Sequence, residues 1–165
     1  ALVGKRFVME DMEKISYSGT FFGETLSIAA AIATIKKLEQ ENVIQHVHGN
    51  NALLDQQVAT LCRRYDSPLR LQNSVGLTRI LFEGRGEATE QDVKTLFIQE
   101  MAQAGVLIIA SHNLSYAHGP NEIKRVLSAY DHALGVIKDA LEKGDIKERV
   151  SGHSISASAN VRAAS

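Results

Sequence analysis

The strongest pattern of hydrophobic and polar positions lies near the end of the chain, where apolar residues recur every three or four positions. Pro120 suits the first position of a helix, because its missing N–H needs no partner there. Gly144 suits the left-handed residue that follows many helices. The pattern therefore predicts a helix over about Pro120–Lys143. Its core stripe is Ile123, Val126, Leu127, Tyr130, Leu134, Ile137 and Leu141.

Helical spacing also appears in three longer segments that come earlier in the chain. Thr89 and Asp92 match a capping box before one of them, and Gly105 marks its end. Another contains a weak point at Gly49–Asn51 and ends before Pro68, because the residue before a proline avoids the α region. The predicted helices are about Glu24–Gln40, Asn42–Tyr65 and Glu90–Gln103, and a shorter one is expected around Phe7–Glu13.

The period changes to two in "LRLQNSVGLTRILFEG". This alternation predicts antiparallel strands at about 69–74 and 77–83 around a turn at Gly76. The apolar run "VLIIAS", residues 106–111, predicts a buried strand, and Leu2–Val3 a short one. The order of elements predicts an α+β domain: a small three-stranded, mainly antiparallel sheet with helices packed on one face. The final residues are small, polar and without a pattern, so 145–165 are expected to form a mobile tail.

Composition narrows the class of protein. With 44% hydrophobic and 22% charged residues, the 165-residue chain is typical of a globular domain. A net charge of -1 and 5% aromatic residues give no electrostatic or stacking footprint for nucleic acid or an anionic membrane. No apolar run is long enough to span a bilayer. Cys62 has no second cysteine to pair with, which fits a reducing, cytoplasmic location.

The candidate chemical groups are few. His112 and His118 flank the loop before the last helix and could line a site, but no third and fourth ligand is near, so surface or hydrogen-bonded loop histidines are favoured over a metal site. Arg63 and Arg64 could lower the pKa of Cys62, although a small apolar residue on a helix is the favoured interpretation. The serines of the tail lack rigid support for nucleophilic catalysis. Lysines at 5, 36 and 37 are expected to be exposed, so no catalytic residue is assigned.

The turn "YSGTFFGET" offers the most specific signal. Ser18, Gly19 and Thr20 precede a helix, whose free N–H groups and dipole suit a phosphate. Gly19 permits close backbone approach, and Thr20 adds a hydroxyl donor. From chemistry alone a simple helix entrance is favoured over an anion site, and both alternatives stay open.

The segment "ALVGKRFVME…YSGTFFGETLSIAAAIATIKKLE" closely resembles the class III (fold-type I) pyridoxal-phosphate aminotransferases, nearest to the glutamate-1-semialdehyde aminomutase-like subgroup. "SHNLSYAHGPNEIKRVLSAYDHAL" resembles the C-terminal strand, loop and helix of the same family, and the likeness runs in order from Ala1 to Leu141. Members are homodimers in which the threonine of a Gly-Thr pair reaches the phosphate of the partner subunit's pyridoxal phosphate. The resemblance assigns this role to Thr20, with Gly19 beside it.

The resemblance also limits what the chain is expected to do. The family's Schiff-base lysine and the acid that pairs with the pyridine nitrogen lie upstream of Ala1, and Lys5 matches a non-catalytic position. The chain therefore resembles a C-terminal portion: 1–23 from the large cofactor-binding domain, 24–144 the small α+β domain with its linking helix, and 145–165 the tail. The parent would move an amino group on a small amino-acid or amino-sugar substrate, and the chain alone would be inactive. The alternative is an autonomous α+β dimerisation module without cofactor.

Overall fold

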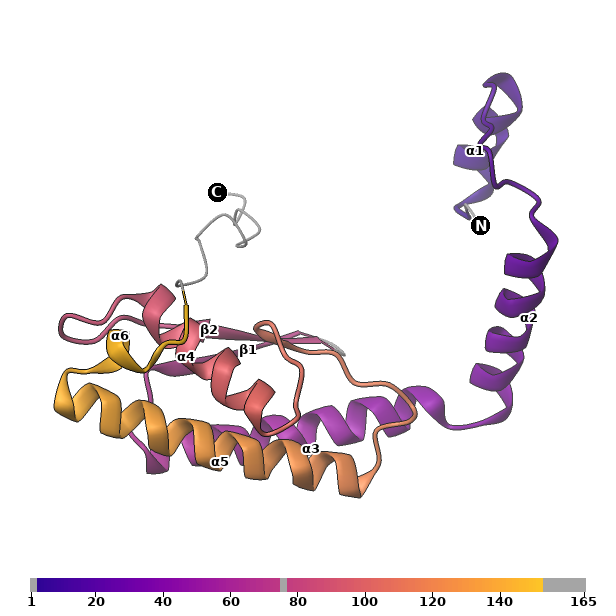
Figure 1. The fold of residues 1–165 in the computed structure, drawn as a ribbon. Helices are drawn as coiled ribbons and strands as arrows, with labels where there is room; N and C mark the ends of the chain where they lie inside the picture. Colours follow the sequence, from indigo (N-terminus) through magenta and orange to yellow (C-terminus); the bar gives the residue numbers. More distant parts are fainter. Residues whose placement is uncertain (1–2, 75–76, 153–165) are drawn as a thin grey trace. The chain divides into compact units, whose positions relative to one another are not determined.

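The computed structural model describes residues 3–74 and 77–152, and its contacts divide the chain into two units, 1–42 and 43–165 (Figure 1). In the first unit, α1 (Arg6–Met9) continues into the 3₁₀ helix η1 (Glu10–Lys14), close to the short helix that the sequence predicts. A turn then leads to α2 (Thr25–Gln40), which confirms the next predicted helix to within one residue. Val3 is exposed and not in a strand, and Leu2 lies outside the described residues.

The second unit is an α+β domain, as predicted. Its elements are α3 (Val43–Arg64), β1 (Leu69–Ser74), β2 (Leu77–Phe82), α4 (Glu90–Gln103), β3 (Ser111–His112), α5 (Pro120–Lys143) and α6 (Ile146–Arg149). The three strands are antiparallel in the order β1-β2-β3, and β1 and β2 pair over their full length, from Leu69 opposite Phe82 to Ser74 opposite Leu77. The predicted turn at Gly76 lies outside the described residues.

The sheet buries one face and exposes the other. Along β2, Thr78, Ile80 and Phe82 are buried, whereas Arg79 and Leu81 are exposed. This alternation places the helices on one face of the sheet, since successive side chains of a strand point to opposite faces. The helices α3 and α4 both contact the strands, and α5 packs against α3 and α4 (Figure 1).

Aromatic side chains lie at the centre of the core. The ring of Phe97 on α4 is 5.4 Å from that of Phe82 on β2 and 5.2 Å from that of Tyr130 on α5. Phe97 and Tyr130 are fully buried. Their tilted contacts add to the burial of apolar surface that drives folding and join the sheet to two helices.

Local signals set the ends of the helices. The hydroxyl of Thr89 accepts from the amide of Asp92 at 3.2 Å, and the Asp92 carboxylate accepts from the amide of Thr89 at 3.0 Å, so the predicted capping box is present. Pro120 is the first residue of α5, and Gly144 ends it with a left-handed φ of 73°. The α3 helix runs unbroken through Gly49.

The predicted strand over 106–111 is wrong in extent. Only Ser111 and His112 pair with β2, and the amide of Ile80 donates to the carbonyl of Ala110 at 2.9 Å. Ala110 has a φ of 132°, which turns the preceding backbone out of the ladder. Leu107 and Ile109 are therefore 90% and 70% exposed, against the burial expected of an apolar run.

The start of the expected mobile tail is folded. Residues 146–149 form α6, and Ile146 and Val150 belong to the core. The guanidinium of Arg149 lies 2.7 Å from a carboxylate oxygen of Asp139 and 2.9 Å from one of Asp145. Ile146 and Val150 are four residues apart, so they lie on the same face of one helical turn and both pack against the core. Residues 153–165 lie outside the described residues.

Candidate functional site

The turn before α2 holds Gly19 and Thr20, the residues that the resemblance assigns to a phosphate. The amide of Phe22 donates to the carbonyl of Gly19 at 3.0 Å, which closes the turn. A Cβ atom at position 19 would lie 2.9 Å from Cε1 of Phe22, whose ring is 5.1 Å from that of Tyr17. A side chain at position 19 would therefore have to displace the exposed ring of Phe22.

This turn carries unpaired donors. Within the described residues, the Thr20 hydroxyl and the amides of Gly19 and Thr20 donate to no other group. Both residues are exposed. A cluster of backbone N–H groups and a hydroxyl without internal partners fits an acceptor such as a phosphate oxygen.

The N-terminus of α2 is occupied by the chain itself. The carboxylate of Glu24, the N-cap residue, accepts from the amide of Leu26 at 2.8 Å and from that of Ser27 at 2.6 Å. Hydrogen bonds from Ser27, and then from Leu26, hold the pKa of the Glu24 carboxyl below its ordinary value. The expectation of free N–H groups at the helix entrance is therefore wrong, and any anion would be held by the turn, not by the helix end.

The lysines are placed as expected. Lys5, Lys36 and Lys37 are all exposed, and Lys37 pairs with Glu41 at 3.1 Å. Cys62 is half-buried on α3, and burial raises the pKa of its thiol by more than Arg63 lowers it. The thiol is therefore not activated by the neighbouring arginines.

His112 is a buried member of a hydrogen-bonded network. Its Nδ1 lies 2.9 Å from the Asp55 carboxylate, and its Nε2 lies 2.7 Å from the Tyr130 hydroxyl. Because a carboxylate only accepts, Nδ1 carries the proton, and Nε2 accepts from Tyr130. Burial lowers the pKa of His112 despite the nearby carboxylate, and burial also raises the pKa of Tyr130, so both side chains stay neutral at pH 7.

The network extends to two further buried side chains. Asn51 donates to a carboxylate oxygen of Asp55 and to the hydroxyl of Thr78, both at 3.0 Å, and Thr78 donates to the same oxygen of Asp55. The Asn51 side-chain oxygen is buried without a partner in the structure. Residues of α3, β2, β3 and α5 are thereby joined through hydrogen bonds inside the apolar core.

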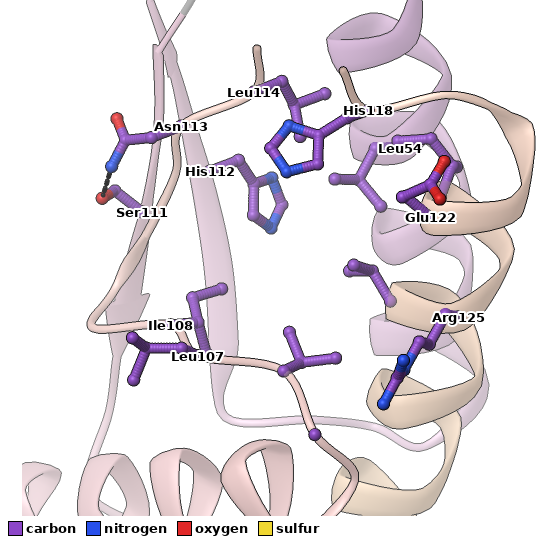
Figure 2. Close-up of a pocket in the computed structure, with 14 residues that line it drawn as sticks. Leu54, Leu107, Ile108, Ser111, His112, Asn113, Leu114, His118, Glu122 and Arg125 are labelled. Atoms are coloured by element: carbon purple, nitrogen blue, oxygen red, sulfur yellow. Dashed lines mark hydrogen bonds between the residues drawn. The ribbon is translucent and has the colours of Figure 1, made fainter.

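His118 lies beside this network at a cavity of about 300 Å³ (Figure 2). The cavity is bounded by residues 105–108 and 111–114, His118, the first two turns of α5 and Leu54. The structure therefore brings both loop histidines to one cavity, with His112 in its buried wall. Among the described residues, no three His, Cys, Asp or Glu side chains converge as metal ligands.

Sequence analysis found His112 and His118 but not their partners. Asp55 and Tyr130 lie 57 and 18 residues from His112 along the chain, and each occupies an ordinary position of a long helix. Nothing in the periodicity marks Asp55 as buried, because a charged residue in a helix is normally solvated.

Within the described residues, no helix has the length and apolar character to cross a bilayer.

Comparison with known proteins gives consistent relatives, although no family model matches the chain. A glutamate-1-semialdehyde 2,1-aminomutase of Clostridium beijerinckii is 24% identical over 144 residues, covering 78% of this chain and 33% of the relative. A 3-aminobutyryl-CoA aminotransferase of Cloacimonas acidaminovorans is 23% identical over 144 residues, covering 86% of this chain and 35% of the relative. The chain thus spans about a third of the length of the curated relatives that it matches.

Solved structures show the same fold. The internal aldimine form of the FumI protein of Sphingopyxis sp. MTA144, which holds pyridoxal phosphate, matches 85% of this chain and 34% of its own, with a TM-score of 0.74 and 19% identity. The match to a transaminase with pyridoxal phosphate bound covers 79% of this chain and 31% of the transaminase, with a TM-score of 0.68 and 17% identity.

The resemblance that the sequence indicates is thereby confirmed. The chain is similar to the C-terminal portion of aminomutases and aminotransferases, and pyridoxal phosphate is the cofactor in both solved structures.

Proposed function

We propose that this chain is the C-terminal portion of a pyridoxal-phosphate-dependent aminotransferase or aminomutase that moves an amino group on a small amino-acid or amino-sugar substrate. The observation that carries the proposal is the turn at Gly19 and Thr20, whose donors have no partner in the described chain and match the family's phosphate contact. The similarity in sequence and fold to the C-terminal third of such enzymes supports it.

The division of labour follows from where the groups lie. Pyridoxal phosphate, when bound, would supply the electron sink that stabilises a carbanion at the substrate carbon next to nitrogen, and the protein would supply binding and orientation. In a homodimer, the Thr20 hydroxyl and the neighbouring amides donate to the phosphate held by the partner subunit. In the enzymes that the chain resembles, the lysine and the acid that hold the cofactor belong to another part of the protein than the portion matched here, so we expect the isolated chain not to catalyse the reaction.

The phosphate role is tested by Thr20→Val in the full-length protein. A hydrogen bond to a charged acceptor contributes about 1.5–3 kcal/mol, so the dissociation constant for pyridoxal phosphate is expected to rise about tenfold or more. Thr60→Val, which removes a hydroxyl bonded to the Gln56 carbonyl on α3, is the control and should leave the constant unchanged. Equal affinity in the wild type and the Thr20 variant would remove Thr20 from the site.

The inactivity of the isolated chain is tested by adding pyridoxal phosphate to it and recording the visible absorbance of lysine-bound cofactor. No stable band is expected, because Lys5 is exposed and lies in no described cavity. A strong band that Lys5→Ala abolishes would contradict this part of the proposal.

The second candidate function is an autonomous dimerisation module that binds no cofactor. Its support is α2, which has no buried residue in the structure and exposes Leu26, Ile28 and Ile32. Sedimentation of the chain with and without residues 1–25 tests it. Self-association that persists without this segment excludes the entrance of α2 as its cause, and cofactor binding by the full-length protein would favour the first candidate.

A further inference from the structure

The cavity beside His118 presents one cation and an apolar lining, and neither belongs to the proposed phosphate contact (Figure 2). We propose that it binds a small carboxylate with an apolar body, whose charge pairs with Arg125. This inference rests on the second unit alone and does not depend on the proposed activity.

Arg125 is positioned against the loop that bounds the cavity. A Cβ atom at Gly105 would meet Nη2 of Arg125, so the guanidinium lies directly against this residue, and the φ of +76° favours glycine there. Within the described residues, Arg125 forms no hydrogen bond or ion pair. Arg125 is exposed at the edge of the cavity, and a guanidinium without an anionic partner among the described residues is suited to a planar carboxylate, which it can bind through two parallel hydrogen bonds.

The acid of the cavity does not neutralise this charge. The carboxylate of Glu122 accepts from the amide of Gly119 at 2.9 Å, as part of the N-terminal capping of α5. Hydrogen bonds from its own amide and that of Gly119 lower the pKa of Glu122, so it stays ionised near neutrality. Its negative charge disfavours ligands of high charge such as a phosphate dianion, and it leaves a monocarboxylate as the better match to a single arginine.

One further donor, on His118, faces the same space. The Nδ1 atom of His118 accepts from the amide of Ser115 at 2.8 Å, which leaves Nε2–H as a donor without a partner in the described chain. The Ser111 hydroxyl accepts from the side-chain amide of Asn113 at 2.9 Å, and Figure 2 shows both side chains on the side of the strand opposite His112, so Ser111 is not a donor to this space. Figure 2 shows the His118 ring beside that of His112, with Arg125 further along α5. A ligand that only accepts hydrogen bonds satisfies this set.

The remaining lining is apolar and the space is small. A volume of about 300 Å³ lies at the lower end for ligand pockets and suits a small ligand. An aliphatic body of a few carbon atoms would bury its surface against the side chains between the donors, which contributes affinity in proportion to the area covered. These side chains are Leu54, Val106, Leu107, Ile108, Leu114, Ile123 and Val126.

The test uses the complete 165-residue chain and two probes of equal shape, 4-methylpentanoate and 4-methylpentanamide, followed by ¹H–¹⁵N NMR titration at constant ionic strength. The carboxylate is expected to shift the resonances of residues 105–114 and 118–126. The amide should bind about tenfold more weakly, because it loses the charge-assisted hydrogen bonds. Equal binding of the two probes, shifts elsewhere, or no shift would each overturn the proposal.

Variants assign the charge to one residue. Arg125→Gln is expected to weaken carboxylate binding about tenfold, while Lys124→Gln, which removes the adjacent exposed cation outside the cavity, should not. Gly105→Ala should weaken binding as well, by displacing the guanidinium. Circular dichroism melts show that each variant is folded, and a rise in the wild-type melting temperature with the carboxylate gives a second measure of binding. The proposal would be contradicted if Arg125→Gln and Lys124→Gln weakened carboxylate binding equally, or if Arg125→Gln changed self-association but not carboxylate binding.

Discussion

At the scale of residues, His112 is a buried titratable side chain whose neutral form is built into a hydrogen-bonded network. It is 3% exposed, and its two ring nitrogens are engaged by Asp55 and Tyr130. Protonation of Nε2 would remove the acceptor of the Tyr130 hydroxyl and place a cation in the core beside Asp55. The native hydrogen bonds of the network therefore require the neutral form of the His112 ring.

This arrangement predicts a pH dependence of stability. Burial lowers the folded-state pKa of His112 below 6.5, so the unfolded chain takes up the proton first as the pH falls. The stabilisation is complete above about pH 6.5 and is lost as the pH falls from there through the folded pKa, by at most about 1.4 kcal/mol per pH unit. Urea denaturation at pH 7.5 and 5.5 measures the change in the free energy of unfolding.

Two variants separate His112 from the other titrating groups. His112→Gln removes the titration and should flatten the decline between pH 7.5 and 5.5, although the variant is less stable throughout. His48→Gln replaces an exposed histidine of α3 and should keep the wild-type decline. An identical decline in the wild type and the His112 variant would show that other residues control it.

At the scale of elements, the sequence predicts what is set locally. The limits of α4 and α5 follow from Thr89, Asp92, Pro120 and Gly144, all of which act within one turn of the helix ends. The limits of β3 do not, because the left-handed backbone at Ala110 depends on the register with β2. The candidate site shows the same difference between local and distant signals. The turn at 18–20 is formed by neighbouring residues, whereas the hydrogen-bonded network of His112 joins residues of four elements, which hydrophobic periodicity cannot predict to be in contact.

The helix α6 gives a prediction at this scale. A chain that ends at Gly144 loses the buried side chains of Ile146 and Val150 and the ion pairs of Arg149, so it should be less stable by about 3 kcal/mol or more. A chain that ends at Gly152 keeps these contacts and should match the full chain. Urea midpoints of the three proteins make the comparison, and a Gly144 truncation as stable as the other two would show that α6 does not belong to the core.

At the scale of the whole molecule, the two units differ in how much apolar surface they bury. Every buried hydrophobic side chain of the described residues lies between Leu54 and Val150, in the second unit. The first unit exposes Phe7, Tyr17, Phe21 and Leu26 together with other large apolar side chains. Contiguous exposed apolar surface is typical of sites that contact a partner, so these side chains are the ones to test in any self-association of the chain.

The second unit should therefore fold without the first. A fragment of residues 43–152 contains the whole described core, including the network around His112, so we expect it to unfold cooperatively with nearly the urea midpoint of the full chain. In the full chain, limited proteolysis should cut first within residues 1–42, because this unit has no buried core to protect its backbone. A fragment that lacks a cooperative transition, or one with a much lower midpoint, would mean that the first unit stabilises the second. The first unit would then contribute to the stability of the second unit, and it would not be a segment that packs only against a separate partner.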